Sequence, residues 1–134
     1  MNKEELIKLV DSLELPKGEY SILSSGSLVI RGIYDRAGDL DLHVTEVGFE
    51  YIKSKYDIYF KDEKHEYNNP LYAFKNLDID FFVMPNEDMH FDYVDGYPVQ
   101  DVQEILDFKK KRNLPKDQDP IRKITEYIEN KRNY

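Results

Sequence analysis

The chain has 134 residues, no cysteine and a formal net charge of −8, from 19 basic and 27 acidic side chains. This length predicts a single domain, and a hydrophobic content of 40% is enough for a modest core. The acidic excess disfavours a protein that coats nucleic acid, because neutralising phosphates needs a basic face. Without cysteine, disulfides and thiolate metal sites are excluded. With no signal-type leader or long apolar stretch, we expect a cytoplasmic protein that does not bind membranes.

The first segment predicts an amphipathic helix followed by a short strand. Asn2 is a suitable N-cap, and Glu5 three residues later completes a capping box. Apolar residues then recur at helical spacing at Leu6, Leu9, Val10 and Leu13. Residues 20–24 form an apolar run of strand length, and Gly26-Ser27 then begins a segment that we expect to be a short helix.

Residues 39–44, DLDLHV, alternate strictly between polar and apolar side chains. This pattern predicts a strand with Asp39, Asp41 and His43 on one face and the apolar residues on the other. The segments that follow predict a helix over 46–55 and strands over 57–61, 71–74 and 77–84.

The last third of the chain predicts a loop and two closing helices. Residues 85–98 mix Pro, Gly, Asp and Asn, so we expect a loop or an irregular sheet edge there. Asp101 is a suitable N-cap for one helix, and Asp119 followed by Pro120 predicts the start of another. We therefore expect C-terminal helices over about 101–132, in a single α+β domain whose helices pack on a mixed twisted sheet.

Paired carboxylates are the strongest chemical signal. Asp39 and Asp41 would lie roughly 7 Å apart along one strand face, where like charges repel and favour a bound cation. Hard divalent cations, Mg²⁺ above all, prefer such oxygen ligands. Asp78 and Asp80 have the same spacing on another predicted strand. If the two strands are neighbours, three or four carboxylates converge on one or two metals, which suits phosphoryl or nucleotidyl transfer.

A phosphate-binding element would complete such a site. Gly26-Ser27 follows a strand and precedes a predicted helix, where glycine permits close backbone approach and helix N–H groups favour anions. The Gly-Ser pair alone is a weak signal. Followed after eleven residues by Asp-Leu-Asp on an alternating strand, it becomes much more specific.

Three segments together resemble the nucleotidyltransferase superfamily with the DNA polymerase β-like fold. They are SILSSGS at 21–27, GDLDLHV at 38–44 and DIDFFV at 78–83, within a core of residues 20–84. The segment RGIYDRAGDLDL and the tail LDFKKKRNLPKDQDPIRKITEYI are similar to small bacterial members of toxin–antitoxin or antibiotic-modifying type. The resemblance implies a palm-like nucleotidyltransferase fold over the single domain 1–134.

The resemblance also implies an activity. The protein would transfer a nucleoside monophosphate from an NTP such as ATP to a hydroxyl, with release of pyrophosphate, using Mg²⁺ or Mn²⁺. The acceptor would be a small molecule, a protein or a short RNA end, rather than a long nucleic acid. It would bind on loops such as 62–70 and 85–98, at a homodimer interface or on a cognate protein partner. The alternative is a catalytically degenerate module that binds nucleotide or a partner protein.

The site residues implied by the resemblance fall into two groups. Those with a catalytic and metal-binding role are Asp39, Asp41 and Asp80, with Asp78 as the rival for the third position. Those expected to bind nucleotide are Gly26, Ser27, Arg36, Lys109 and Lys116. For His43 we expect a solvated or hydrogen-bonded strand histidine, with a supporting or substrate-contacting role as the alternative. The KKKR run at 109–112 is expected to be a solvated helix end.

Overall fold

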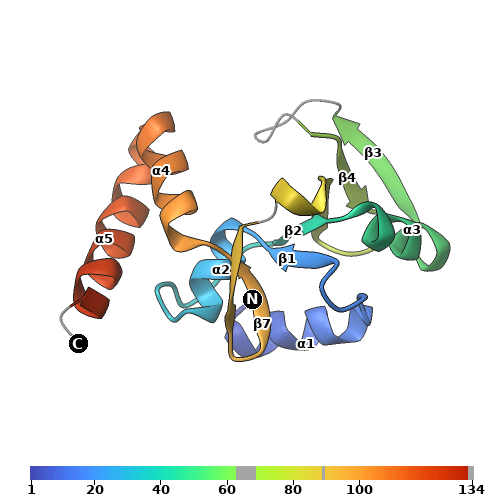
Figure 1. The fold of residues 1–134 in the computed structure, drawn as a ribbon, viewed down its shortest axis with the longest axis horizontal. Coiled ribbons are helices and arrows are strands. Elements are labelled where there is room, and N and C mark those ends of the chain that lie inside the picture. Colours follow the sequence, from blue (N-terminus) through green and yellow to red (C-terminus); the bar gives the residue numbers. More distant parts are fainter. Residues whose placement is uncertain (63–68, 89, 133–134) are drawn as a thin grey trace.

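A computed structural model describes residues 1–62, 69–88 and 90–132. Over these residues, seven strands form one mixed sheet in the order β3-β4-β5-β2-β1-β7-β6 (Figure 1). The strands are β1 (Tyr20–Ile22), β2 (Leu40–Val44), β3 (Ile58–Asp62), β4 (Leu71–Phe74), β5 (Ile79–Val83), β6 (Phe91–Val94) and β7 (Tyr97–Gln100). The expected α+β class with a mixed sheet is therefore correct.

The centre of the sheet places the two acidic strand segments side by side. β2 and β5 run parallel, and so do β1 and β7, whereas the other neighbouring pairs are antiparallel. In the β2–β5 ladder, Asp41 lies opposite Asp80. A parallel pair cannot be joined by a short hairpin, so residues 45–78 make the crossover, with a helix and two strands between.

Five α-helices occur in the described residues: α1 (Lys3–Leu13), α2 (Ser24–Ile30), α3 (Glu46–Lys55), α4 (Val102–Arg112) and α5 (Gln118–Arg132). The capping box predicted for α1 is confirmed, since Asn2 accepts from the Glu5 N–H and Glu5 accepts from the Asn2 N–H. Among these residues every helix is too short or too polar to cross a membrane.

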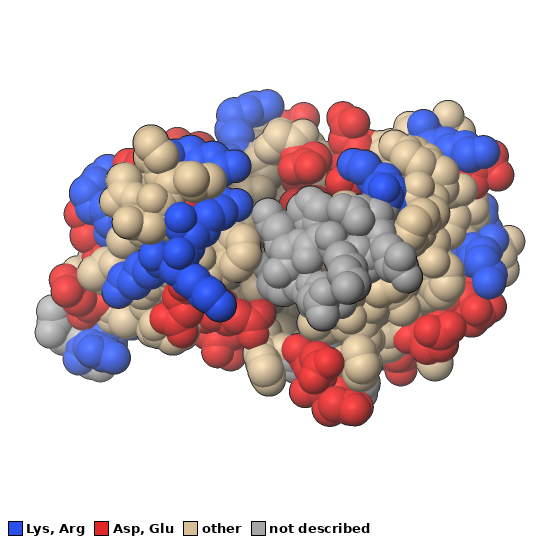
Figure 2. Space-filling view, turned by 90° about the horizontal axis from the view of Figure 1, so that it is seen from above, with Lys and Arg blue, Asp and Glu red and all other residues tan. Residues whose placement is uncertain are grey.

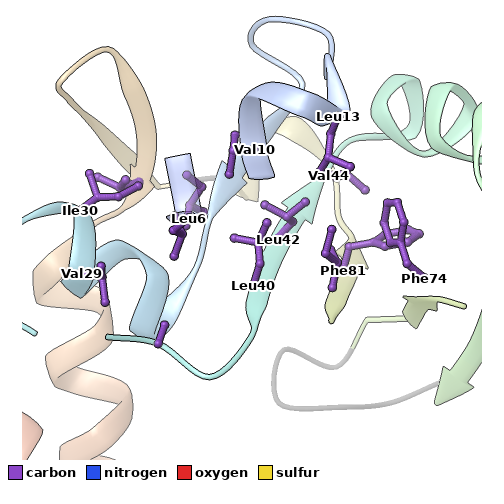
Figure 3. Close-up of a cluster of buried hydrophobic side chains, with 14 of the residues drawn as sticks. Leu6, Val10, Leu13, Val29, Ile30, Leu40, Leu42, Val44, Phe74 and Phe81 are labelled. Carbon is purple, nitrogen blue, oxygen red and sulfur yellow. The ribbon is translucent and has the colours of Figure 1, made fainter. Parts of the chain in front are cut away.

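The main core lies on the apolar face of β2. Leu40, Leu42 and Val44 alternate with the acidic side chains along the strand and pack with residues of α1 and α3. Figure 3 shows this cluster of buried side chains. From α1 the packing residues are Leu6, Val10 and Leu13, and from α3 Ile52. This buried layer fixes the backbone of β2, so that the side chains on the opposite face project from a rigid strand.

A second, smaller core attaches α4 and α5 at one end of the sheet (Figure 1). Its buried members are Leu28 of α2, Ile105 and Leu106 of α4, and Ile124 of α5. These apolar residues of α4 and α5 hold the two closing helices to α2.

Two sequence predictions differ from the structure. Within 85–98, expected to be a loop or irregular edge, Phe91–Val94 forms β6 and pairs with β7 across an Asp95-Gly96 turn. Both turn residues have positive φ (53° and 85°), the geometry of a tight hairpin turn. Asp119 does not cap α5: a short 3₁₀ turn over Pro115–Asp117 leads into it, and α5 begins at Gln118.

Candidate functional site

Three carboxylates meet on the polar face of the central strands. Asp41 lies on β2, Asp39 immediately precedes that strand, and Asp80 lies on the adjacent parallel strand β5. One carboxylate oxygen from each of the three residues lies within 4.8 Å of the other two. Because each of the two strands carries an apolar underside in the core, the three acidic groups are held together by the fold.

The negative charge of this cluster is partly compensated by a lysine. Partial burial and the charge of Asp80 raise the pKa of Asp39, although Asp39 remains exposed to solvent. Lys61 of β3 donates from Nζ to Asp80 Oδ2 at 3.0 Å. This hydrogen bond in turn raises the pKa of Lys61, so that the lysine stays protonated. The repulsion between these carboxylates favours the binding of a cation.

An open pocket of about 530 Å³ adjoins the cluster. Across the sheet, Tyr59 of β3 lies opposite Ala73 of β4, and Ala73 lies opposite Asp80. The small side chain of Ala73 leaves a hollow between the tyrosine and the carboxylate. Lys61 and Lys75 also line the pocket, so its wall carries negative and positive side chains as well as an aromatic ring.

The structure distinguishes between the two candidates for the third carboxylate by position. Asp80 belongs to the cluster with Asp39 and Asp41, at ligand-sharing distance. Asp78 precedes β5, is exposed and lines the pocket, and its charge adds to the rise in the pKa of Asp39. The preference for Asp80 agrees with this geometry, and its chemical role stays a prediction.

Gly26 and Ser27 lie inside α2, which begins two residues earlier at Ser24. Both are buried. The Ser27 hydroxyl donates to the Gln100 carbonyl at 2.9 Å and accepts from Arg31 Nη1. The structure therefore gives this pair a packing role between α2 and β7. Nucleotide binding by Gly26 and Ser27 stays a prediction.

The basic residues expected to bind nucleotide make other contacts. Arg36 is exposed, with Nη2 3.7 Å from Glu5 Oε1 of α1. Lys109 Nζ lies 4.0 Å from Oδ1 of the buried Asp117. Lys116 is exposed in the turn before α5. These contacts connect Arg36 and Lys109 to structural carboxylates rather than to the acidic cluster.

The C-terminal lysines belong to a charged end of the molecule. Figure 2 shows Lys and Arg side chains gathered at the end formed by α4 and α5, where Lys109, Lys110, Lys111 and Arg112 form the last turn of α4. Arg112 donates from Nε to Asp117 Oδ2 at 3.0 Å and lowers the pKa of that carboxyl. The helix dipole favours cations at this position, so the run has a structural explanation.

His43 shares the acidic face of β2 but is buried rather than solvated, with 2% of its surface exposed. Burial lowers its pKa to about 4, so the ring is neutral at pH 7. Its Nε2 atom has no hydrogen-bond partner in the part of the chain that the structure describes. Of the two expected states, solvated or hydrogen-bonded, the solvated one is therefore wrong, whereas a backbone hydrogen bond with Met84 contributes to the pKa of the ring.

Sequence reasoning missed Tyr59, Lys61 and Lys75 as residues of the pocket. Tyr59 and Lys61 are two positions apart in the predicted strand 57–61, and this spacing indicates that they share a face. Which face, and which strand lies next to it, depends on long-range pairing. Of the loops expected to hold an acceptor, residues 63–68 lie outside the described residues.

Comparison with known proteins gives little further guidance. Neither a protein-family model nor a curated protein matches the chain. Among solved structures, the chain is similar to JHP933 from Helicobacter pylori, with 15% sequence identity and a TM-score of 0.45. The similarity covers 79% of this chain and 53% of that chain, so this protein spans about half the length of JHP933.

Proposed function

We propose that the protein is a Mg²⁺-dependent nucleotidyltransferase with the polymerase β-like fold. It would transfer a nucleoside monophosphate from an NTP to a hydroxyl acceptor and release pyrophosphate. The observation that carries the proposal is the cluster of Asp39, Asp41 and Asp80 on adjacent parallel strands beside an open pocket. The order of motifs in the sequence, Gly-Ser, Asp-Leu-Asp and a later Asp-bearing strand, supports the same assignment.

The donor set fits a hard divalent cation. Three carboxylates supply oxygen ligands only, which favours Mg²⁺ or Mn²⁺ over softer metals. The pKa of Asp39 is raised first by burial and then by repulsion from Asp80, and a bound cation would relieve the repulsion. Asp39, Asp41 and Asp80 would hold the ion, which would supply Lewis-acid stabilisation of phosphate charge and help to activate an attacking hydroxyl.

The chain's own residues would position the reactants. Asp41 and Asp80 are fixed by the β2–β5 ladder, so a ligand bound between them meets rigid donors. Lys61 and Lys75 supply positive charge to the pocket, which favours a phosphate-bearing ligand. Tyr59, 47% exposed at the pocket wall, offers a ring on which an apolar or aromatic group can pack.

Labelled NTPs, Mg²⁺ and candidate acceptors test the proposal. Transfer of the α-phosphoryl label and pyrophosphate release are measured for wild type, Asp41→Asn and Asp80→Asn. Loss of a metal ligand removes several kcal/mol of transition-state stabilisation, so we expect a fall of about 100-fold or more in each variant. Asp78→Asn, which removes a carboxylate from the same pocket but not from the cluster, is the matched control and keeps most activity.

Two results would contradict this assignment. Transfer that persists in an Asp39→Asn, Asp41→Asn double variant would refute the metal site. Release of inorganic phosphate instead of pyrophosphate would indicate a metal-dependent phosphohydrolase that uses the same carboxylates.

A specific observation favours a second candidate, a catalytically degenerate module that binds nucleotide or a partner protein. Ser27, expected to contact the triphosphate, has its hydroxyl engaged by Gln100 and Arg31 in the interior. Such a module would bind nucleotide without turnover, or bind none. Equilibrium dialysis with labelled ATP, run beside the transfer assay, separates the two functions, because only the enzyme converts the ligand it binds.

A further inference from the structure

Lys61 contacts the acidic cluster directly. It lies on β3, two strands away from Asp80, and it reaches Asp80 Oδ2 at 3.0 Å across β4. The residue of β4 opposite Asp80 is Ala73, and a larger side chain there would obstruct this path. The sheet therefore holds an ammonium group beside the oxygen that a metal would need.

The ion pair is placed so that it can open. The side chains of Lys61 and Asp80 are 38% and 25% exposed, so water can replace either partner. An exposed pair of this kind is weak, and no large barrier holds the lysine in place. If Lys61 swings away from Asp80, its ammonium remains in the same pocket, which Lys75 also lines.

A lysine ammonium and a divalent cation compete when they need the same carboxylate. Both are attracted by the cluster of Asp39, Asp41 and Asp80, but the ammonium is singly charged and tethered. A divalent ion that binds Asp80 releases Lys61, which then adds positive charge to the pocket. Binding of the cation and of an anionic ligand would thus reinforce each other, as two coupled sites must do reciprocally.

We infer that Lys61 is a built-in counter-ion that competes with the divalent cation for Asp80 and, when displaced, binds the phosphate groups of the ligand. This inference rests on the proposed function, since it takes the acidic cluster as the cation site. It assigns Lys61 two opposite effects: it weakens the binding of the cation alone and strengthens the binding of the phosphate-bearing ligand once the cation is present.

Mn²⁺ titration, followed by calorimetry or electron paramagnetic resonance, tests the first effect on the full chain. Lys61→Gln should bind Mn²⁺ about two- to tenfold more tightly than wild type, because a competing charge beside Asp80 is gone. Lys75→Gln removes the same charge from the same pocket without touching the ion pair, and should change Mn²⁺ affinity less. Lys61→Arg keeps the charge and should bind Mn²⁺ as wild type does.

A non-hydrolysable ATP analogue tests the second effect. Its affinity is measured with and without saturating Mn²⁺, and the gain due to the metal should be smaller in Lys61→Gln than in Lys75→Gln. Circular dichroism checks that each variant is folded. Because the metal chelates the analogue equally in all samples, the difference between variants reports the protein alone.

The outcomes separate this inference from the proposed function. The role of Lys61 would be overturned if Lys61→Gln bound Mn²⁺ no more tightly than wild type. It would also be overturned if Lys75→Gln raised the Mn²⁺ affinity by the same factor as Lys61→Gln. Absence of Mn²⁺ binding in all variants would overturn both this role and the metal assignment. If Lys61→Gln binds Mn²⁺ more tightly but the protein transfers no nucleotide to any acceptor, the role of Lys61 as counter-ion is supported. In that case only the proposed transferase activity is contradicted.

Discussion

The substitution Gly26→Ala tests whether the Gly-Ser motif is needed for core packing or for contact with a ligand. A Cβ added at this position would lie 2.8 Å from Ile22 Cγ2 and 3.5 Å from Leu6 Cδ1. Both neighbours are fully buried, and Cγ2 of Ile22 is attached directly to the branched Cβ of a strand residue. Because neither methyl group can move into solvent, Gly26→Ala must shift α2 away from β1 or strain the core.

The size of the effect follows from two opposing contributions. Overpacking a core of this kind costs about 1–3 kcal/mol, whereas alanine in a helix is favoured over glycine by about 0.5–1 kcal/mol. We expect Gly26→Ala to lower the free energy of unfolding by about 1–2 kcal/mol, a fall in Tm of roughly 4–7 °C. Gly38→Ala is the control: no atom lies within 4 Å of its added Cβ, so its stability should stay within about 0.5 kcal/mol of wild type.

Nucleotide affinity, measured where the variant is fully folded, completes the assay. If Gly26 serves packing, Gly26→Ala binds an ATP analogue nearly as tightly as the wild-type protein. Wild-type stability combined with a loss of tenfold or more in affinity would refute the steric argument. That result would instead indicate that the backbone at Gly26 approaches the phosphates.

Two further predictions concern pH and the attachment of the C-terminal helices. In metal-free buffer, stability should fall from pH 6.5 towards pH 4, because burial lowers the pKa of His43 from 6.5 to about 4 and the unfolded state binds more protons in this window. The full effect is roughly 3 kcal/mol, and urea unfolding of wild type and His43→Gln measures it; identical pH slopes would contradict it. Ile124→Ala should cost about 2–5 kcal/mol, because Ile124 is fully buried among residues of α2 and α4. Hydrogen exchange should show α4 and α5 opening more than the central strands, and equal opening throughout would argue against a separate attachment.

Local signals were sufficient to predict most of the elements. The capping box of Asn2 and Glu5 and the alternation over 39–44 each involve residues within one turn or one strand, so no distant partner is needed to interpret them. The β6–β7 hairpin was missed because acidic residues, proline and glycine dominate 85–98. Its Asp95-Gly96 pair is a strong hairpin signal when flanked by residues such as Tyr93 and Tyr97.

The candidate site depended on information that the sequence carries less directly. Asp78 and Asp80 lie on the same face of one segment, so spacing alone cannot choose between them, whereas the β2–β5 register puts Asp80 opposite Asp41. Contacts between segments far apart in the sequence could not be predicted either. Lys61 meets Asp80 only because β4 lies between their strands, and Gln100 holds Ser27 across 73 residues.

The net charge of −8 is less informative about ligands than the balance of charge at the pocket. Asp39, Asp78 and Asp80 line it beside Asp41, and Lys61 and Lys75 oppose them, so these side chains carry a formal charge of −2. Without a cation, this pocket repels a phosphate-bearing ligand. One divalent ion neutralises it and a second makes it positive, so the cation must bind before or with the anionic ligand. This order holds for the enzyme and for a non-catalytic module alike, so only turnover, and not the order of binding, can distinguish them.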